Sequence, residues 1–308
     1  MRRAIVLLGC LLVASSPAAA QQRPRLEHVD DAVLRSPRLV ESSGVTTSTR
    51  RAGVLWTHND SGDEPRLYAT DSAGDDLGSL LVTGARNVDW EDLGAGPCPG
   101  VAARCLFPAD IGDNLHSRRE IVVYRLPEPE PPNGAADTLR SVSVESALVL
   151  RYPDHPHDAE AIVVDPAARM FIITKEAFGR PRVYRVPPRA APQRPGDVDT
   201  LRFVGLLDIA PNLLLLRVVT GAAVSPDGVT LAVRTYSSLH FFRLRGDSLP
   251  TPLTPARGLM IPFVEPQGEG VAFVAPDLLV LTSERGNAAF GTVARVRVIG
   301  LPETSPGP

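Results

Sequence analysis

The chain has 308 residues, of which 44% are hydrophobic and 22% charged, and its formal net charge is −3. This composition is ordinary for a globular protein in water, and it argues against nucleic-acid binding, which requires a basic face. The 25 glycines and 30 prolines are on the high side, as expected of many short strands joined by turns.

Residues 1–20 are typical of a secretory signal peptide. Two arginines open the segment, an apolar run follows at residues 4–14, and Ala18-Ala-Ala20 provides a cleavage site. The apolar run is too short for a permanent anchor, so we expect no integral membrane span. The alternative is a lipoprotein cleaved before Cys10, but the apolar segment before that residue is very short. We therefore expect export by ordinary cleavage, to the periplasm or the extracellular space.

Export gives the two cysteines of the mature chain a specific meaning. Cys98 and Cys105 lie seven residues apart in a segment rich in proline and glycine, between two expected strands. In an oxidising compartment such a pair predicts a disulfide that ties a hairpin. Two cysteines alone do not make a zinc site.

The mature chain repeats one pattern, in which an acidic residue and one or two small residues precede an apolar strand. The copies begin at Glu41-Ser-Ser-Gly-Val, Trp90-Glu91-Asp92-Leu93, Asp158-Ala-Glu160-Ala-Ile and Gln267-Gly-Glu269-Gly-Val, with a degenerate copy at Thr220-Gly-Ala-Ala-Val that lacks the acid. Spacings of roughly 50–70 residues are typical of propeller blades or solenoid units. A second and a third apolar strand follow each start. The pattern predicts an all-β fold, a β-propeller with five blades of four antiparallel strands, as one domain over residues 21–300.

In chain order, the expected blades are residues 41–82, 91–151, 160–208, 220–263 and 269–300. In the second blade, residues 141–151 alternate well enough to form the outer strand. The segment before Glu41 is expected to supply the fourth strand of the last blade and so to close the ring. Six blades are the alternative, if the long spacing between Glu91 and Glu160 hides a divergent unit. Residues 213–216 are expected to be strand or loop, and residues 301–308 a disordered tail.

The repeated motifs also resemble a known group of proteins. Glu-Ser-Ser-Gly-Val from Glu41, Leu-Trp-Thr-His-Asn-Asp from Leu55, and the later Asp-Trp-Glu-Asp and Asp-Ala-Glu-Ala-Ile are similar to motifs of bacterial exported propellers. The nearest families are the SdiA-regulated propellers and the propellers named for the esterase-like activity of phytase. This resemblance implies a polar central channel that often holds a calcium ion, and it does not imply a particular activity. Thr220, where the pattern has an acid, departs from it.

The recurring acid opens the innermost strand of each blade, so Glu41, Glu91, Glu160 and Glu269 are expected to converge at one mouth of the channel. Four carboxylates so close together cannot all stay ionised without positive charge among them. Calcium, which takes six to eight oxygen ligands, is the simplest remedy. Arg234 or Arg217 could neutralise them instead. The alternative is that each glutamate caps a turn and faces solvent.

Polar residues at the ends of the second strands are expected to face the same mouth. His58 and Asp60 follow the first of these strands, and equivalent positions in the other blades carry oxygen ligands or charges. The candidate ligand-binding residues are Asp89, Asp113, Asn114, Lys175, Arg234 and Glu284. Several of these residue types are also common in tight turns, which is the competing interpretation.

Lys175 is the only lysine of the chain, among 32 basic residues. A lysine can take roles that an arginine cannot, because its pKa falls readily on burial. Beside the glutamates we expect a charged ammonium paired with Glu160 or Glu176. The competing interpretation is an ordinary surface lysine.

A catalytic role depends on few candidates. No Gly-x-Ser-x-Gly motif is present, and His58, Asp60 and His157 are the residues that could handle a proton. His155 and His157, with Asp158, could also be metal ligands, although such a pair in a proline-rich loop is usually part of a solvated turn.

Three functions remain open from the sequence. The first is a non-enzymatic scaffold or binding protein with calcium or a small polar ligand at the channel mouth. The second is a calcium-dependent esterase, lactonase or phosphoesterase, in which the metal polarises the substrate and water attacks. The third is a platform for protein partners on the rim. We expect a monomer.

Overall fold

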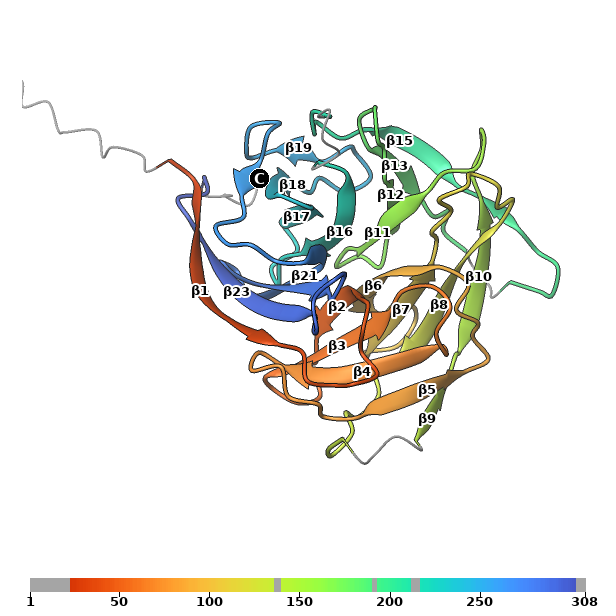
Figure 1. The fold of residues 1–308 in the computed structure, drawn as a ribbon. Coiled ribbons are helices and arrows are strands. Elements are labelled where there is room, and N and C mark those ends of the chain that lie inside the picture. Colours follow the sequence, from red (N-terminus) through yellow and green to blue (C-terminus); the bar gives the residue numbers. More distant parts are fainter. Residues whose placement is uncertain (1–22, 136–139, 190–192, 212–216, 303–308) are drawn as a thin grey trace, which may run out of the picture.

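We analysed a computed structural model of the chain, which describes residues 23–135, 140–189, 193–211 and 217–302. These residues form 23 strands and no helix. The strands gather into five sheets that stand around a common centre, as Figure 1 shows. The fold is therefore a five-bladed β-propeller, and the described residues contain no sixth sheet. The expected signal peptide, the leucine run at residues 213–216 and nearly all of the expected tail lie outside the described residues.

The first three blades follow the chain from the inside outward. Blade 1 consists of β2 (Ser42–Thr47), β3 (Val54–Asn59), β4 (Arg66–Asp71) and β5 (Ser79–Thr83). Blade 2 consists of β6 (Trp90–Pro97), β7 (Arg104–Asp110), β8 (Ile121–Pro127) and β10 (Ser146–Arg151). Blade 3 consists of β11 (Ala159–Val164), β12 (Met170–Thr174), β13 (Arg182–Arg185) and β15 (Arg202–Leu206).

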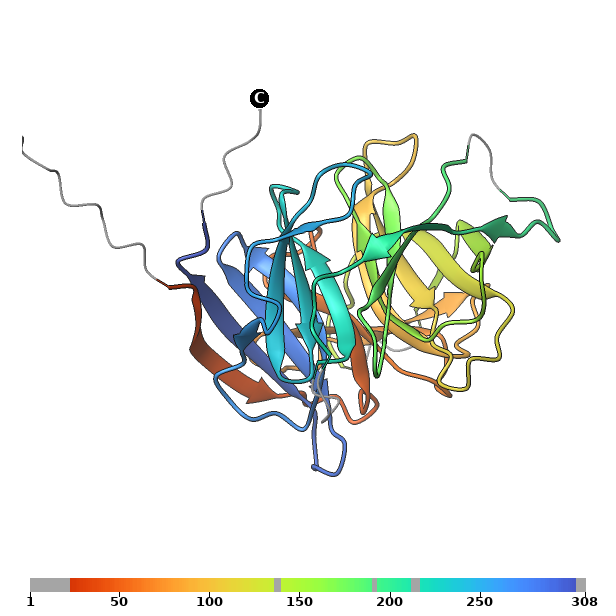
Figure 2. The ribbon, with the colours of Figure 1, turned by 90° about the horizontal axis from the view of Figure 1, so that it is seen from above.

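The last two blades depart from this simple order at their outer edges. Blade 4 consists of β16 (Val219–Val224), β17 (Thr230–Thr235) and β18 (Ser238–Arg243), with the two short strands β19 (Thr251–Pro252) and β20 (Leu259–Met260) both paired to β18. Blade 5 consists of β21 (Gln267–Ala275), β22 (Leu278–Glu284) and β23 (Thr292–Ile299), and its outer strand is β1 (Arg25–Val33). Antiparallel pairing runs from Arg25 opposite Ile299 to Val33 opposite Thr292. Figure 2 shows β1 beside β23, so the expected closure of the ring by the N-terminal strand is confirmed.

One strand prediction is wrong in detail. Residues 141–151 were expected to form one outer strand of blade 2, but the chain changes blades within them. β9 (Ser141–Ser143) pairs in parallel with β5 of blade 1, and only β10 belongs to blade 2. The crossing falls at Val144 and Glu145, whose backbone amides donate to Thr83 and Arg125 of the two blades. A second parallel strand, β14 (Asp199–Thr200), extends blade 2 beyond β10 in the same way.

The core lies between the blades rather than inside them. Five clusters of buried apolar side chains each fill one space between neighbouring blades, for example Trp56 and Trp90 between blades 1 and 2. Both faces of these strands are therefore covered, which explains why every residue of β11, the inner strand of blade 3, and of β17, the second strand of blade 4, is buried. At the centre the inner strands approach closely. A Cβ at Gly44 of β2 would lie 2.3 Å from the backbone nitrogen of Leu93 on β6, so only glycine fits there.

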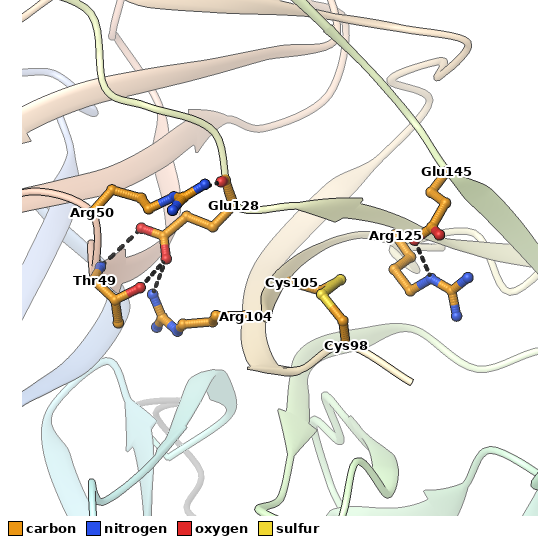
Figure 3. Close-up of a disulfide and its surroundings, with 8 residues drawn as sticks. All are labelled: Thr49, Arg50, Cys98, Arg104, Cys105, Arg125, Glu128 and Glu145. Atoms are coloured by element: carbon orange, nitrogen blue, oxygen red, sulfur yellow. Dashed lines mark hydrogen bonds and ion pairs between the residues drawn. A yellow bond between two sulfur atoms is a disulfide. The ribbon is translucent and has the colours of Figure 1, made fainter. Parts of the chain in front are cut away.

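The hairpin between β6 and β7 carries the expected disulfide. Cys98 and Cys105 are bonded, and both are buried (Figure 3). No helix among the described residues is long and apolar enough to cross a membrane.

Candidate functional site

The candidate site is the end of the central channel at which the inner strands begin. Each inner strand is the edge strand of its sheet, and neighbouring inner strands contact one another around the centre. Glu91 on β6, Glu160 on β11 and Glu269 on β21 are all at least 97% buried. Glu41 lies just before β2, is exposed, and forms a backbone bridge with Glu284. Three of the four recurring glutamates are thus buried at this mouth, and the fourth lies at its edge.

Five carboxyl groups from three blades form the centre of the site, which we call the carboxylate cluster. Asp60, Asp89 and Glu91 each place an oxygen within 4.8 Å of the others, and so do Glu91, Asp158 and Glu160. Glu91 belongs to both groups and joins them. Asp60 follows β3, whereas Asp89 and Asp158 each lie two residues before the glutamate of their blade.

From the sequence, Asp158 was considered only as a possible metal ligand beside His155 and His157, and not as a partner of the recurring glutamates. The signal for it was present, because Asp89-Trp-Glu91 and Asp158-Ala-Glu160 repeat the same acid-x-acid spacing in two blades. In the structure Asp89 and Glu91 belong to one of the two groups of the cluster, and Asp158 and Glu160 to the other. Tyr236 and Gln267 were also missed. Gln267 donates to Oε1 of Glu269 at 3.0 Å.

Lys175 supplies positive charge at the cluster. Its Nζ lies 2.5 Å from Oε1 of Glu160 and 5.9 Å from the centre of the Tyr236 ring. The attraction of Glu160 raises the pKa of Lys175 far above its usual range despite burial, so the ammonium is charged at neutral pH. The structure therefore pairs the lysine with Glu160 rather than with Glu176.

Burial raises the pKa of most carboxyl groups in and around the cluster. Burial and the charges of Asp60 and Asp158 raise the pKa of Asp89 to about 6. Burial raises the pKa of Glu160 to about 7, against the opposing effect of Lys175. The pKa values of Glu91 and Glu269 are raised well above the ordinary range by burial and by the charge of Glu160. At neutral pH this mouth therefore holds protons or attracts a cation.

The polar segment at the end of β3 has a structural role. His58 is fully buried, stands edge-on to Trp90, and its Nδ1 contacts the carbonyl of Asn59 at 2.9 Å. Burial lowers its pKa to about 4, so the ring is neutral. Asn59 accepts from the backbone of Val40 and Glu41. Of this segment, Asp60 is the residue that the structure brings to the carboxylate cluster.

The polar segment at the end of β7 forms a structured loop that contacts the cluster. Asp110 forms an ion pair with Arg118 at 2.7 Å, and Asp113 accepts from the backbone of Ser117 and Arg118. The backbone amide of Asp113 donates to Asp158 at 2.8 Å, which ties this loop to the cluster. Asn114 is exposed. Asp113 therefore contacts the site through its backbone, and its carboxylate is occupied within the loop.

Arg234 does not belong to the carboxylate cluster. It is fully buried between blades 4 and 5, where its guanidinium donates to the carbonyls of Gly270 and Thr282 and pairs with Glu265. Arg217 lies near His240, whose pKa it helps to lower. Neither arginine forms an ion pair or a hydrogen bond with the recurring glutamates among the contacts of the described residues.

Asp92, next to Glu91 on β6, is a further buried carboxyl group. It is 1% exposed, and its oxygens accept from the backbone amides of Leu93 at 2.8 Å and Ile162 at 2.9 Å. It thus links β6 to β11 at the axis. Burial raises its pKa to about 7 although these amides oppose the shift. The repeat did not reveal this residue because only one blade carries it.

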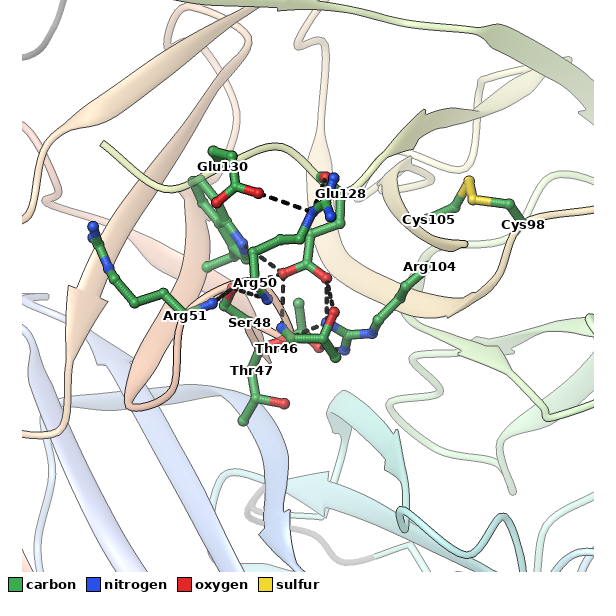
Figure 4. Close-up of polar contacts among 12 residues, drawn as sticks. Thr46, Thr47, Ser48, Arg50, Arg51, Cys98, Arg104, Cys105, Glu128 and Glu130 are labelled. Carbon is green, nitrogen blue, oxygen red and sulfur yellow. Dashed lines mark hydrogen bonds and ion pairs between the residues drawn. A yellow bond between two sulfur atoms is a disulfide. The ribbon is translucent and has the colours of Figure 1, made fainter. Parts of the chain in front are cut away.

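The opposite end of the channel differs in character. A cavity of about 520 Å³ opens there between the far ends of the inner strands, with mostly apolar walls. Arg104 at its rim lies 3.3 Å from Glu128 and donates to Thr46, and Glu128 in turn accepts from Ser48 and Thr49 (Figure 4). This network and the disulfide connect the end of β2, the β6–β7 hairpin and the residue after β8 at the rim. The two ends of the channel therefore offer different chemistry, acidic at one and largely apolar at the other.

The arrangement at the acidic mouth suits a hard cation. Oxygens bound to one ion at about 2.4 Å lie no more than about 4.8 Å apart, and the carboxylate cluster satisfies this limit twice through Glu91. Oε2 of Glu269 is buried without a hydrogen-bond partner, which is unusual for a carboxylate. Among the described residues, Ser238 and His240 of β18 are a serine and a histidine in hydrogen-bond contact, with Oγ and Nε2 3.1 Å apart, and both are buried.

Comparison with known proteins gives distant structural similarity only. No protein-family model and no curated protein matches the chain. A PQQ-bound aldose sugar dehydrogenase from Streptomyces coelicolor is similar with 13% identity and a TM-score of 0.46, over 90% of this chain and 98% of that one. The β-propeller domain of Cps50 (Swd1) from Myceliophteria thermophila has 13% identity and a TM-score of 0.39, over 87% and 99%. A gluconolactonase from Xanthomonas campestris has 13% identity and a TM-score of 0.39, over 80% and 68%. Similarity this distant carries no inference about activity or ligand.

Proposed function

We propose that the protein binds a calcium ion at the acidic mouth of its channel and acts as a binding protein or scaffold. The observation that carries this proposal is the burial of several carboxyl groups together, with Lys175 as the cation in direct contact. A buried carboxylate needs a charged partner or a proton, and calcium satisfies several at once.

The residues that would hold the ion are those of the carboxylate cluster. Asp60, Asp89, Glu91, Asp158 and Glu160 supply up to ten oxygens, more than the six to eight that calcium takes. Glu269 and Glu284 lie close enough for their charges to act on the same groups, and Glu41 acts on Glu284. The buried Oε2 of Glu269 without a partner fits an additional cation on this side of the mouth.

We also infer that the protein is exported and related to the SdiA-regulated propellers. The disulfide is consistent with an oxidising compartment. The motifs around Glu41, Glu91 and Glu160 support the family resemblance, and in the structure they open three inner strands of the propeller.

A calcium-dependent hydrolase is the second candidate function. The observation in its favour is that burial brings the pKa of Asp89 to about 6 and that of Glu284 to about 7, values suited to a general base near neutral pH. In this mechanism a water molecule would attack an ester or phosphoester polarised by the ion.

Calorimetric titration of the metal-free protein with calcium tests the proposal, together with melting curves in chelator and in calcium. Calcium at about 100 times its Kd should stabilise the protein by about 2.7 kcal/mol. Glu91→Gln, which removes the carboxylate shared by both groups, should weaken binding by at least about tenfold. The matched control is Glu130→Gln, which removes an exposed carboxylate paired with Arg50 near the opposite end of the channel and should leave binding unchanged.

Absence of calcium binding by the wild-type protein would contradict the proposal, and so would equal affinity of the two variants. Calcium-dependent hydrolysis of an ester or phosphoester panel that is lost in Asp89→Asn would favour the hydrolase over the scaffold.

A further inference from the structure

We propose that Asp154, His155 and His157 form a second metal site, for a divalent transition-metal ion such as Zn²⁺. The three residues lie in the segment that leads from β10 of blade 2 to β11 of blade 3. Each offers a ligand atom within 4.8 Å of the others. Asp154 and His155 are exposed, whereas His157 is buried, so an ion can enter from solvent.

The ligands of this site differ chemically from those of the carboxylate cluster. Two imidazoles and one carboxylate suit zinc, copper or nickel, whereas a set of oxygens alone suits calcium. Nε2 of His157 lies 3.1 Å from Oδ2 of Asp154. With metal–ligand bonds of about 2.0–2.2 Å, this is the separation of two ligands bound to the same zinc ion. Nδ1 of His155 contacts the carbonyl of Pro156 at 3.0 Å, which leaves its Nε2 for an ion.

The surroundings of His157 favour a metal at Nε2. Nδ1 of the ring faces Oε1 of Glu176 at 3.7 Å, and Glu176 accepts from Thr174 at 2.9 Å. A carboxylate behind the second nitrogen is the usual support of a metal-bound histidine, because it fixes the ring and its tautomer. A neutral imidazole has one N–H, so with Nδ1 protonated toward Glu176 the ring presents a lone pair at Nε2, where the Tyr184 hydroxyl lies 2.8 Å away. An ion at Nε2 would take the place of that hydroxyl as the partner of the lone pair.

Aromatic contacts hold the ring in this position. Tyr152 stands edge-on to His157 with ring centres 4.9 Å apart, and the hydroxyl of Tyr184 lies 2.8 Å from Nε2. The Tyr184 hydroxyl also reaches Asp154 at 3.0 Å, which keeps the aspartate beside the ring. The geometry is therefore present before any ion arrives.

Among the described residues, the other four histidines belong to no such set of ligands. His58 and His240 are buried in the core, and His28 pairs with Asp31 on β1. His116 is exposed and belongs to no such group of ligands among the described residues. His116→Ala is thus a matched control, since it removes an exposed imidazole without touching the proposed site.

The test is a zinc titration of the metal-free protein in saturating calcium, with the indicator 4-(2-pyridylazo)resorcinol as competitor. We expect one zinc equivalent, and at least about tenfold weaker binding in His155→Ala. Glu176→Gln, which leaves the three ligands in place, should weaken binding roughly tenfold, and His116→Ala should not change it. Copper-loaded protein should show electron-spin couplings to two imidazole nitrogens, and to one in His155→Ala.

Several results would overturn the proposal. They are failure of the wild type to withdraw zinc from the indicator, equal affinity in His155→Ala, or loss of zinc binding in Glu91→Gln instead, which would place the ion in the carboxylate cluster. Because calcium is titrated separately, His155→Ala should keep the calcium affinity of the wild type. His155 is exposed, so this variant should also melt at the wild-type temperature in chelator.

Discussion

Glu284, at the end of β22, shows how the acidic mouth affects stability. Burial and the charges of Asp60, Glu41 and Glu160 raise its pKa from an ordinary 4.5 to about 7. The folded protein therefore binds this proton more tightly than the unfolded chain does. Below pH 4.5 the group is protonated in both states, and between pH 4.5 and 7 its effect on stability becomes steadily more unfavourable. Above pH 7 the unfavourable effect is complete.

The variant Glu284→Gln should remove this effect. In chelator and above pH 7 we expect it to melt at least about 2 °C above the wild type, and the difference should vanish toward pH 4. Melting curves of both proteins across this pH range provide the measurement. The exposed Glu130→Gln should show no such pH dependence, and a constant difference for Glu284→Gln at all pH values would refute the explanation.

At the scale of single elements, the hairpin of β6 and β7 is held by a disulfide and by a network of polar contacts. The Cys98–Cys105 disulfide closes it, and Glu128, which follows β8, binds the turn after β2 and Arg104 (Figure 4). Both fastenings lie beside the apolar cavity, whereas the same hairpin carries Glu91 and Asp92 at its other end. The hairpin that carries Glu91 is therefore fixed at the end opposite the carboxylate cluster.

Replacement of both cysteines by alanine should lower the free energy of unfolding by about 2–3 kcal/mol, because the bond restricts a short loop in the unfolded chain. Denaturant unfolding of the variant and of the wild type, with and without reductant, measures this. Reductant should have no effect on the variant. Alkylation of Cys98 or Cys105 in unreduced wild-type protein would show that the bond is not formed.

For the whole molecule, the decisive contact is the one between the two ends of the chain. β1 is the outer strand of blade 5, and its pairing with β23 joins distant parts of the sequence, with Asp30 and Arg295 in contact although 265 positions apart. The ion pair of Asp30 with Arg295 lies in the same contact. Without β1, the edge of β23 and the apolar side chains near Leu26 would face water, a condition that promotes aggregation.

Deletion of residues 1–33 should therefore abolish cooperative unfolding and cause association, whereas deletion of residues 1–22 should leave a monomer. Light scattering coupled to size exclusion, with melting curves, distinguishes these outcomes. A monomeric 1–33 deletion that melts at the same temperature would show that the ring does not depend on this closure.

The sequence alone determined the architecture, because the repeated motif and the alternation of apolar residues are local properties. They predicted five blades, the closing strand and the disulfide. They also placed Glu91 and Glu160 at the start of inner strands, where the repeat puts equivalent residues at one mouth of the channel. The exception is the change of blades at Val144 and Glu145, which local patterns did not predict because it depends on partners in two different sheets.

Only the tertiary structure decided which polar residues meet. Arg234 is buried against Glu265, 31 residues later in the chain, and His58 packs under Trp90 of the next blade. Asp92 satisfies backbone amides on β6 and β11, and Asp154 stands beside His157 and Tyr184. Glu265, Trp90, the amide of Ile162 and Tyr184 each lie on another strand or loop than their partner, and the packing of the blades decides which groups come together. Charge, burial and the ability to hold an ion are properties of that packing, so a repeat in the sequence could indicate the mouth but not the set of ligands around it.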